Sequence, residues 1–395
     1  MSGALKSNIW KYTVLLVTNK RVFVAILGAY YLTIPDVNTF WIGVFLLAGN
    51  GAKFIFDIPS SYLADKIGHK EALVLSRVSM ILSTLLFLFI PTIWGLVFAS
   101  IFLSIGFAFM SGVGSAFMHE TLRSLGRADE YTAVMGKASS IGFFVPAVMA
   151  TVVPFFVSVS YQIPFIIGLV LDLVGLIMAA SLVRSAVPPE HAAETDRMSY
   201  IKVVHQGLVL RFFRIAAFSG IVSALLDGID GFRAPYQLAL AVPVIWFGIF
   251  FGTGRVLASL MLAYSGKIRQ IVGDVYSYQR AQIIVYGALL LIIGFISTPW
   301  VVVLVLILDN GLQYGMSQVD TGYLLDIIRN NKFKATLLST SNQLESLFSM
   351  IVVFVMGAAI AQFGYQNSFA VLAGIFLLLV VPFHLYIVRN RPITS

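Results

Sequence analysis

Apolar stretches of about 20 residues recur along the whole chain and are separated by short polar connections. A helix of this length and composition can cross the roughly 30 Å hydrocarbon layer of a bilayer. Because no water satisfies backbone groups inside that layer, a spanning segment must close its own hydrogen bonds as a helix. About twelve such segments fill the 395 residues and leave no room for a sizeable soluble domain. The sequence therefore predicts an all-α integral membrane protein.

The composition excludes several other classes of protein. Hydrophobic residues make up 59% of the chain and charged residues only 11%, against about a quarter in soluble domains. The net charge of +8 is spread between the apolar stretches and forms no aromatic-interleaved patch, so we expect no nucleic-acid partner. The chain has no cysteine, which excludes disulfides and thiolate metal sites. We expect no metal and no cofactor.

The apolar stretches divide into two groups of six predicted spans. The first six are residues 11–34, 40–62, 72–91, 93–118, 138–158 and 162–183, and the last six are 214–235, 244–264, 280–297, 299–324, 335–362 and 365–388. The longest hydrophilic segment lies between the groups, so we predict a six-helix bundle in residues 1–183, a cytoplasmic linker in 184–211 and a second bundle in 212–395. Polar residues at Thr18–Arg21 interrupt the first span, which could instead begin at Val22 after a surface helix.

Basic residues gather in alternate connections. Lys66 and Lys70 lie between spans two and three and Arg123 and Arg127 between spans four and five, whereas Pro91 and Thr92 lie in a connection without basic residues. The positive-inside rule places the basic connections in the cytoplasm. Both termini are then cytoplasmic, which requires an even number of spans. We expect a monomer in a bacterial cytoplasmic (inner) membrane.

The two halves share a short sequence pattern. Trp41-Ile-Gly43-Val-Phe45 is echoed by Trp246-Phe-Gly248-Ile-Phe250, and Gly68 is matched by Gly273 at the same separation. Chance similarity between apolar helices is one explanation. The other is a parallel repeat of two six-span halves, an architecture found among transporters.

The connection after the second span reads Ser61-Tyr-Leu-Ala-Asp65-Lys-Ile-Gly68-His-Lys70. It resembles the signature loop of the major facilitator superfamily (MFS), Gly-x-Leu-Ala-Asp-Arg-x-Gly-Arg-Lys. The preceding Phe56-Asp57-Ile-Pro59 resembles the lead-in of its drug-efflux-like branch. The resemblance implies the MFS fold, transport by alternating access, and a gating motif that includes Asp57, Asp65, Gly68 and Lys70.

Parts of this motif also have a direct physical interpretation. Gly68 permits a turn that a side chain would obstruct. Asp65 can accept hydrogen bonds at a helix N-terminus, where the dipole favours an anion. The resemblance implies that this helix is the eleventh span, beginning near Lys334, and that the contact latches the outward-open state. Alternatively, Asp65 caps a local turn.

Two positions depart from the family pattern. Ser61 replaces the first glycine of the signature loop. The fifth span has Ser140-Ile-Gly142-Phe-Phe-Val-Pro146 in place of the Gly-Pro pair of family antiporters, which removes one support for drug–proton antiport.

Several ionisable residues fall inside predicted spans, where each costs roughly 2.5–3.5 kcal/mol on insertion scales. The proton-coupling candidates are Asp309, Asp227, Asp230, Arg255 and Glu345. Asp309 lies in the middle of span ten, where a buried carboxyl can bind and release a proton. Arg255 of span eight could pair with Asp309, Glu345 or Asp230, either as part of coupling or as a static ion pair.

Asp227 and Asp230 share one face of span seven, and nearby glycines weaken that helix. The resemblance places span seven at the central cavity, where these carboxylates suit an ion or a cationic substrate. Alternatively, Arg233 neutralises one of them at the end of the span. Candidate cavity residues are Tyr30, Tyr31, Asn310, Gln313 and Gln318, although aromatic residues in such a chain commonly face lipid or pack helices.

We interpret the chain as a transporter and not an enzyme, because it contains no paired metal-ligand motif, nucleophile elbow or ATP-binding loop. The leading hypothesis is proton-coupled export of a small amphipathic organic solute. Proton-driven nutrient uptake, and a lipid flippase or non-transporting receptor on the same scaffold, are the alternatives. The expected partners are a small-molecule substrate, protons and the lipid bilayer.

Overall fold

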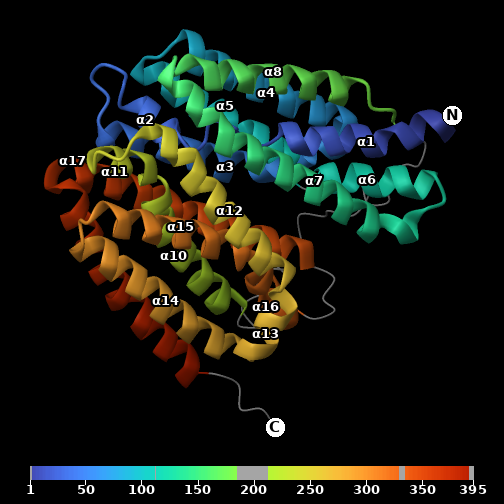
Figure 1. Cartoon of the computed structure of the whole chain (residues 1–395). Coiled ribbons are helices and arrows are strands. Elements are labelled where there is room, and N and C mark those ends of the chain that lie inside the picture. Colours follow the sequence, from blue (N-terminus) through green and yellow to red (C-terminus); the bar gives the residue numbers. More distant parts are fainter. Residues whose placement is uncertain (1, 112, 185–211, 329–333, 391–395) are drawn as a thin grey trace. The chain divides into compact units, whose positions relative to one another are not determined.

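The computed structural model describes residues 2–111, 113–184, 212–328 and 334–390, and all regular structure in these ranges is helical (Figure 1). The first half contains α1 (Ser2–Thr18), α2 (Leu27–Tyr31), α3 (Thr39–Ile67), α4 (His69–Phe89), α5 (Ile93–Met110), α6 (Val113–Ser124), α7 (Tyr131–Val152) and α8 (Gln162–Ala180). The second half contains α10 (Phe212–Asp230), α11 (Arg233–Ala239), α12 (Phe247–Ala263), α13 (Ser265–Val272), α14 (Val275–Phe295), α15 (Pro299–Gly315), α16 (Ser317–Ile328) and α17 (Lys334–Arg389).

The helices account for the predicted spans. Ten helical stretches in the described ranges are long and apolar enough to cross a membrane. One of them, in α17, holds two spans, because Gly364 adopts φ 77° and ψ 171° and breaks the helix between them. The shorter helices α1 and α2 occupy the position of the first predicted span. The prediction of an all-α protein with about twelve spans is confirmed.

The first span is a broken helix. α1 ends at Thr18, as the polar interruption in the sequence suggested. Its inward side packs in the core, with Tyr12 and Leu15 only 3% and 0% exposed, so α1 is not a surface helix. The buried side chain of Arg77 in α4 lies at this helix end and donates from Nη2 to the Leu15 carbonyl at 3.4 Å and to Asn19 Oδ1 at 2.8 Å. A cation there complements the negative end of the helix dipole.

The chain divides by its contacts into two compact units. Unit 1 comprises Met1–Asp36 and Ala48–Thr195, and unit 2 comprises Val37–Leu47 and Asp196–Ser395. The start of α3 belongs to unit 2 because it crosses α17 closely: a Cβ on Gly43 would lie 3.0 Å from Cα of Gly357. Only Arg184 of the predicted linker, residues 184–211, is described.

Matching glycines have matching surroundings in the two units. Gly68 follows α3 with φ 106° and Gly273 follows α13 with φ 83°, a backbone region that favours glycine. A Cβ on Gly49 of α3 would lie 3.1 Å from Ser104 Oγ of α5, and one on Gly254 of α12 would lie 2.9 Å from Asn310 Oδ1 of α15. These correspondences favour the repeat over chance similarity.

Candidate functional site

The carboxylate of Asp227 on α10 joins three helices inside unit 2. Gln313 of α15 donates from Nε2 to Oδ1 at 3.0 Å. Ser349 of α17 donates from Oγ to Oδ2. In the part of the chain that the structure describes, no cation pairs directly with this carboxylate. Asp227 is therefore held by neutral donors.

Asp230, one turn further along, has an ionic partner. α10 ends at this residue and α11 begins three residues later, so Arg233 folds back and its Nη1 pairs with Oδ1 of Asp230. Asn310 Nδ2 of α15 lies 3.4 Å from the same oxygen. The sequence left open whether Arg233 neutralises one of the two carboxylates. In the structure Arg233 pairs with Asp230.

Asp309 of α15 is the most deeply buried of these carboxylates. It is 1% exposed, and its Oδ1 has no hydrogen-bond partner among the described residues. The charged groups that act on it are Asp230, Asp227 and Arg233. Because Arg233 already pairs with Asp230, the interior contains more carboxylates than cations. We call Asp227, Asp230, Asp309 and Arg233 the acidic cluster.

Arg255 of α12 does not join the acidic cluster through an ion pair with Asp309. Its guanidinium lies 3.4 Å from the ring centroid of Tyr314 and 4.7 Å from that of Phe251. Arg233 approaches the same Phe251 ring at 4.9 Å. Such contacts stabilise a cation by the negative face of an aromatic ring. Among the described residues, Arg255 therefore stacks on a ring of its own helix, Phe251, and on a ring of α15, Tyr314.

Glu345 of α17 lies one turn before Ser349 and is half-buried. It interacts electrostatically with Asp227 and also with Asp320 of α16. Glu345 therefore extends the acidic cluster toward α16. Across the described ranges, no group of three or more His, Cys, Asp or Glu residues is arranged to hold a metal ion. Such carboxylates at membrane depth can carry protons or attract a cationic group.

The sequence pattern that defines the Major Facilitator Superfamily matches residues 13–331, most of the chain. The chain belongs to the Major Facilitator Superfamily. It is accordingly a multi-pass membrane transport protein and not an enzyme. Membership of this family implies that the substrate is a small molecule. The drug-efflux-like branch suggested by the sequence is not distinguished by this match.

Solved structures of the superfamily share the fold at low sequence identity. The nucleoside transporter NupG matches with a TM-score of 0.79 and 13% identity over 98% of this chain and 100% of that one. The POT family transporter PepTSo matches with 0.73 and 13%, covering 98% of each chain. A bacterial homologue of the human lysosomal transporter Spinster matches with 0.70 and 13%, covering 99% of this chain and 97% of the other.

A curated relative has detectable sequence similarity to this MFS chain. It is the uncharacterized transporter BU466 of Buchnera aphidicola subsp. Acyrthosiphon pisum (strain APS), with 27% identity over 128 residues. The chain covers about a third (32%) of that relative's length, and the match covers 32% of this chain.

The MFS gating motif is described in part. Gly68 has the positive φ that its place in the motif requires, and a Cβ there would lie 2.5 Å from Glu71 Oε2. Asp57 is half-buried in α3 and interacts with Lys53, one turn earlier. Lys70 is half-buried at the start of α4. The side chains of Asp65 and Lys334 are not among those that the structure describes. The latch between Asp65 and the helix that begins near Lys334 therefore remains a prediction.

The candidate cavity residues have different surroundings. Tyr30 and Tyr31 of α2 are 7% and 4% exposed, and the Tyr30 hydroxyl donates to the carbonyl of Phe87 in α4. Both rings pack in an aromatic group of unit 1 with Phe87 and neighbouring rings. Asn310 and Gln313 contact the acidic cluster, whereas Gln318 lies exposed on α16.

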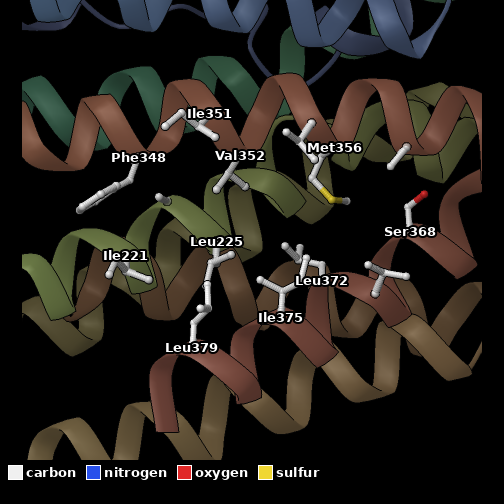
Figure 2. A pocket seen from close by; sticks show the side chains of 14 residues that line it. Ile221, Leu225, Phe348, Ile351, Val352, Met356, Ser368, Leu372, Ile375 and Leu379 are labelled. Carbon is white, nitrogen blue, oxygen red and sulfur yellow. The ribbon is translucent and has the colours of Figure 1, made fainter. Parts of the chain in front are cut away.

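An apolar pocket of about 350 Å³ lies between α10 and both parts of α17 (Figure 2). Leu225, Val352 and Leu372 line it from these three helical segments. Ser368 is its polar lining residue, and that hydroxyl donates to the Gly364 carbonyl at 2.7 Å. The pocket therefore offers mainly hydrocarbon contacts.

A second buried charged group lies in unit 1; the sequence had marked its Asp172 as an ionisable residue inside a span, but not its Arg77. Arg77 of α4 is 0% exposed, and Arg21 pairs at 2.7 Å with Asp172 of α8, also 0% exposed. Arg77 fits because α8 has Gly175, whose Cβ would lie 3.0 Å from Arg77 Cδ. The available signal was an arginine inside the apolar run 72–91, where a charge is as costly as in the other spans.

Proposed function

We propose that this MFS protein is a proton-coupled secondary transporter that exports a small amphipathic organic solute by alternating access. Asp309 is the proton carrier in this proposal. The observation that carries it is the burial of Asp309 without a cation of its own, since the nearby Arg233 pairs with Asp230.

The environment of Asp309 suits reversible protonation. Burying an ionised carboxylate without a paired cation is costly, whereas the neutral acid is tolerated in a low-dielectric interior. Ionised Asp227 and Asp230 nearby add like-charge repulsion to that cost. Water that reaches Asp309 in one transport state would allow it to ionise. Protonation therefore changes the relative free energies of the states, as coupling requires.

Asp227 is suited to a different role. Its hydrogen bonds from Gln313 and Ser349 connect α10, α15 and α17, so a solute that engages this carboxylate would act on three helices together. A solute with a cationic or hydrogen-bond-donating end would contact the cluster. The apolar pocket between α10 and α17 in the same unit favours a solute that also carries a hydrocarbon part.

The variant Asp309→Asn tests the proton role. Asparagine keeps the size and polarity of the side chain but cannot take up or release a proton. In proteoliposomes, we expect it to abolish flux driven by a proton gradient while retaining exchange of labelled solute for unlabelled solute. Full proton-driven flux in this variant would remove Asp309 from the mechanism. Asp326→Asn, an exposed carboxylate on α16, is the matched control.

Proton-driven uptake of a hydrogen-bonding nutrient is the second candidate. The observation that favours it is the pair of amides at the cluster: the oxygens Asn310 Oδ1 and Gln313 Oε1 have no hydrogen-bond partner in the described chain. A polar solute could donate to such oxygens. Accumulation of labelled solute in energised cells would support uptake, whereas depletion would support export.

A further inference from the structure

Two arginines and one carboxylate are buried together in the interior of unit 1. Arg77 of α4 and Asp172 of α8 lie on helices that run side by side (Figure 1). Arg21 lies in the non-helical segment between α1 and α2, is 8% exposed, and pairs with Asp172 at 2.7 Å. We call Arg21, Arg77 and Asp172 the buried charge group. It contains two cations and one anion, so it carries an excess of one positive charge.

Arg77 carries this excess charge. Its Nη2 donates to the Leu15 carbonyl and to Asn19 Oδ1, which are both neutral acceptors. The carboxylate that acts electrostatically on Arg77 is Asp172, which already pairs with Arg21. The C-terminal end of α1 contributes only about half of a negative charge. Because a buried cation without a full counter-charge is costly, an added anion would stabilise this interior.

The two arginines also have unused hydrogen-bond donors. Nε and Nη1 of Arg77 and Nε and Nη2 of Arg21 are buried and have no hydrogen-bond partner among the described residues. Buried polar groups of this kind are almost always hydrogen-bonded in folded proteins. A Cβ on Gly175 would lie 3.4 Å from Arg77 Nη1, and Asp172 lies one turn earlier on the same face of α8. The unused donors of Arg77 therefore lie at the helix face from which Asp172 reaches Arg21.

The depth and burial of the group limit what can bind there. Both α4 and α8 are long and apolar enough to span the membrane. At 1.5 Å per residue, Arg77 lies about 12 Å from the start of α4 and Asp172 about 15 Å from the start of α8. These positions are well inside a hydrocarbon layer about 30 Å thick, away from the phosphates of lipid headgroups. Near-complete burial of all three side chains favours a small ion over an organic solute.

We propose that the buried charge group binds one chloride ion. The ion accepts hydrogen bonds from the unused donors of Arg77 and Arg21, and it balances the excess positive charge. Oδ1 of Asp172 also has no hydrogen-bond partner among the described residues, and a water molecule beside the ion would donate to it. Water alone would satisfy the donors but would leave the charge unbalanced. This inference is independent of the proposed transport function.

The thermal stability of the purified full-length protein tests the proposal. Sodium chloride is titrated against sodium gluconate at constant ionic strength, because gluconate is too large for this interior. We expect a saturable rise in Tm of about 3 °C with chloride. Crystals grown with sodium bromide should show an anomalous peak between Arg21 and Arg77. The same Tm in both salts, or no bromide peak there, would show that only water binds and would overturn the proposal.

Two variants should change chloride binding in opposite directions. Arg77→Gln removes the excess charge but keeps an amide that can donate to Asn19, so the chloride dependence of the Tm should disappear. Asp172→Asn doubles the excess charge, so the affinity for chloride should rise about tenfold. Arg184→Gln is the control, because the Arg184 side chain is 72% exposed and lies outside the group. It should respond to chloride as the unmodified protein does.

A purely structural role for these charges predicts a different pattern. Both Arg77→Gln and Asp172→Asn would then lower the Tm equally in chloride and in gluconate. An unchanged chloride response in Arg77→Gln would contradict chloride binding by this group. If Arg77→Gln does not fold, Asp172→Asn decides alone, and an affinity for chloride equal to or below that of the unmodified protein would overturn the proposal.

Discussion

Gln313 on α15 donates a hydrogen bond of 3.0 Å from Nε2 to Oδ1 of Asp227 on α10. The other oxygen of that carboxylate accepts from Ser349 on α17. A single side chain thus couples three helices of one unit, and a change in its charge or hydrogen bonding reaches all three.

Removing one donor should impair transport more than stability. Ser349→Ala deletes a hydrogen bond to Asp227, and interhelical bonds in membranes contribute about 0.6 kcal/mol on average. We expect a small loss of thermal stability in detergent and a several-fold loss of solute flux in proteoliposomes. The control is Ser346→Ala, a serine 4% exposed on the same helix. Equal flux in the two variants would contradict a special role for Ser349.

The Arg233–Asp230 pair should behave as a unit. Arg233→Gln leaves Asp230 without its cation, and breaking a buried ion pair costs about 3 kcal/mol or more. We expect poor expression and a lowered Tm for this variant. The double variant Asp230→Asn with Arg233→Gln removes both charges and should recover most of the lost stability. If the fall in Tm of the double variant equals the sum of the falls in Asp230→Asn and Arg233→Gln measured separately, the two residues are not coupled.

Gly68 should be intolerant of even a methyl group. Its φ of 106° and ψ of 146° lie in a region adopted almost only by glycine, and such a conformation costs about 1–3 kcal/mol in other residues. Gly68→Ala should lower the Tm accordingly. Gly136→Ala is the control, because Gly136 is helical with nothing within 4 Å of its added Cβ. We expect that control to be neutral or stabilising.

The absence of cysteine from the sequence allows a direct test of topology. Pro91 and Ala128 are both exposed in connections between spans, and the positive-inside rule places them on opposite sides of the membrane. A membrane-impermeant maleimide added to intact cells should label Pro91→Cys but not Ala128→Cys. Inside-out vesicles should give the reverse. Labelling of both cysteines from one side would exclude the proposed orientation.

Much of the candidate site was visible in the sequence. Asp227, Asp230 and Asp309 stand out because a charge within an apolar run is costly and therefore conspicuous. Their partners were not visible. The sequence offered both Arg255 and Arg233 as ionic partners of these carboxylates. In the structure Arg233 pairs with Asp230, and Arg255 stacks on Tyr314. The directions of the side chains and the rotation of each helix about its axis decide which residues pair. Neither can be read from the spacing of residues along the sequence.

The break in the first span illustrates the same division. The polar residues after Val17 showed where α1 must end, because the local sequence no longer supports an apolar helix. That Arg77, far along the chain, binds this helix end through Asn19 depended on the packing of α4 and α8 around Gly175.

The sequence alone determined that the chain crosses the membrane about twelve times and belongs with the MFS transporters. Both properties rest on the transfer energies of local segments and on a short contiguous motif, Ser61–Lys70. Only the tertiary structure decided which carboxylate is partnered by a cation, which by neutral donors, and which is buried without a cation of its own. The physical reason is that these properties are set by distances of a few ångströms between helices distant in sequence.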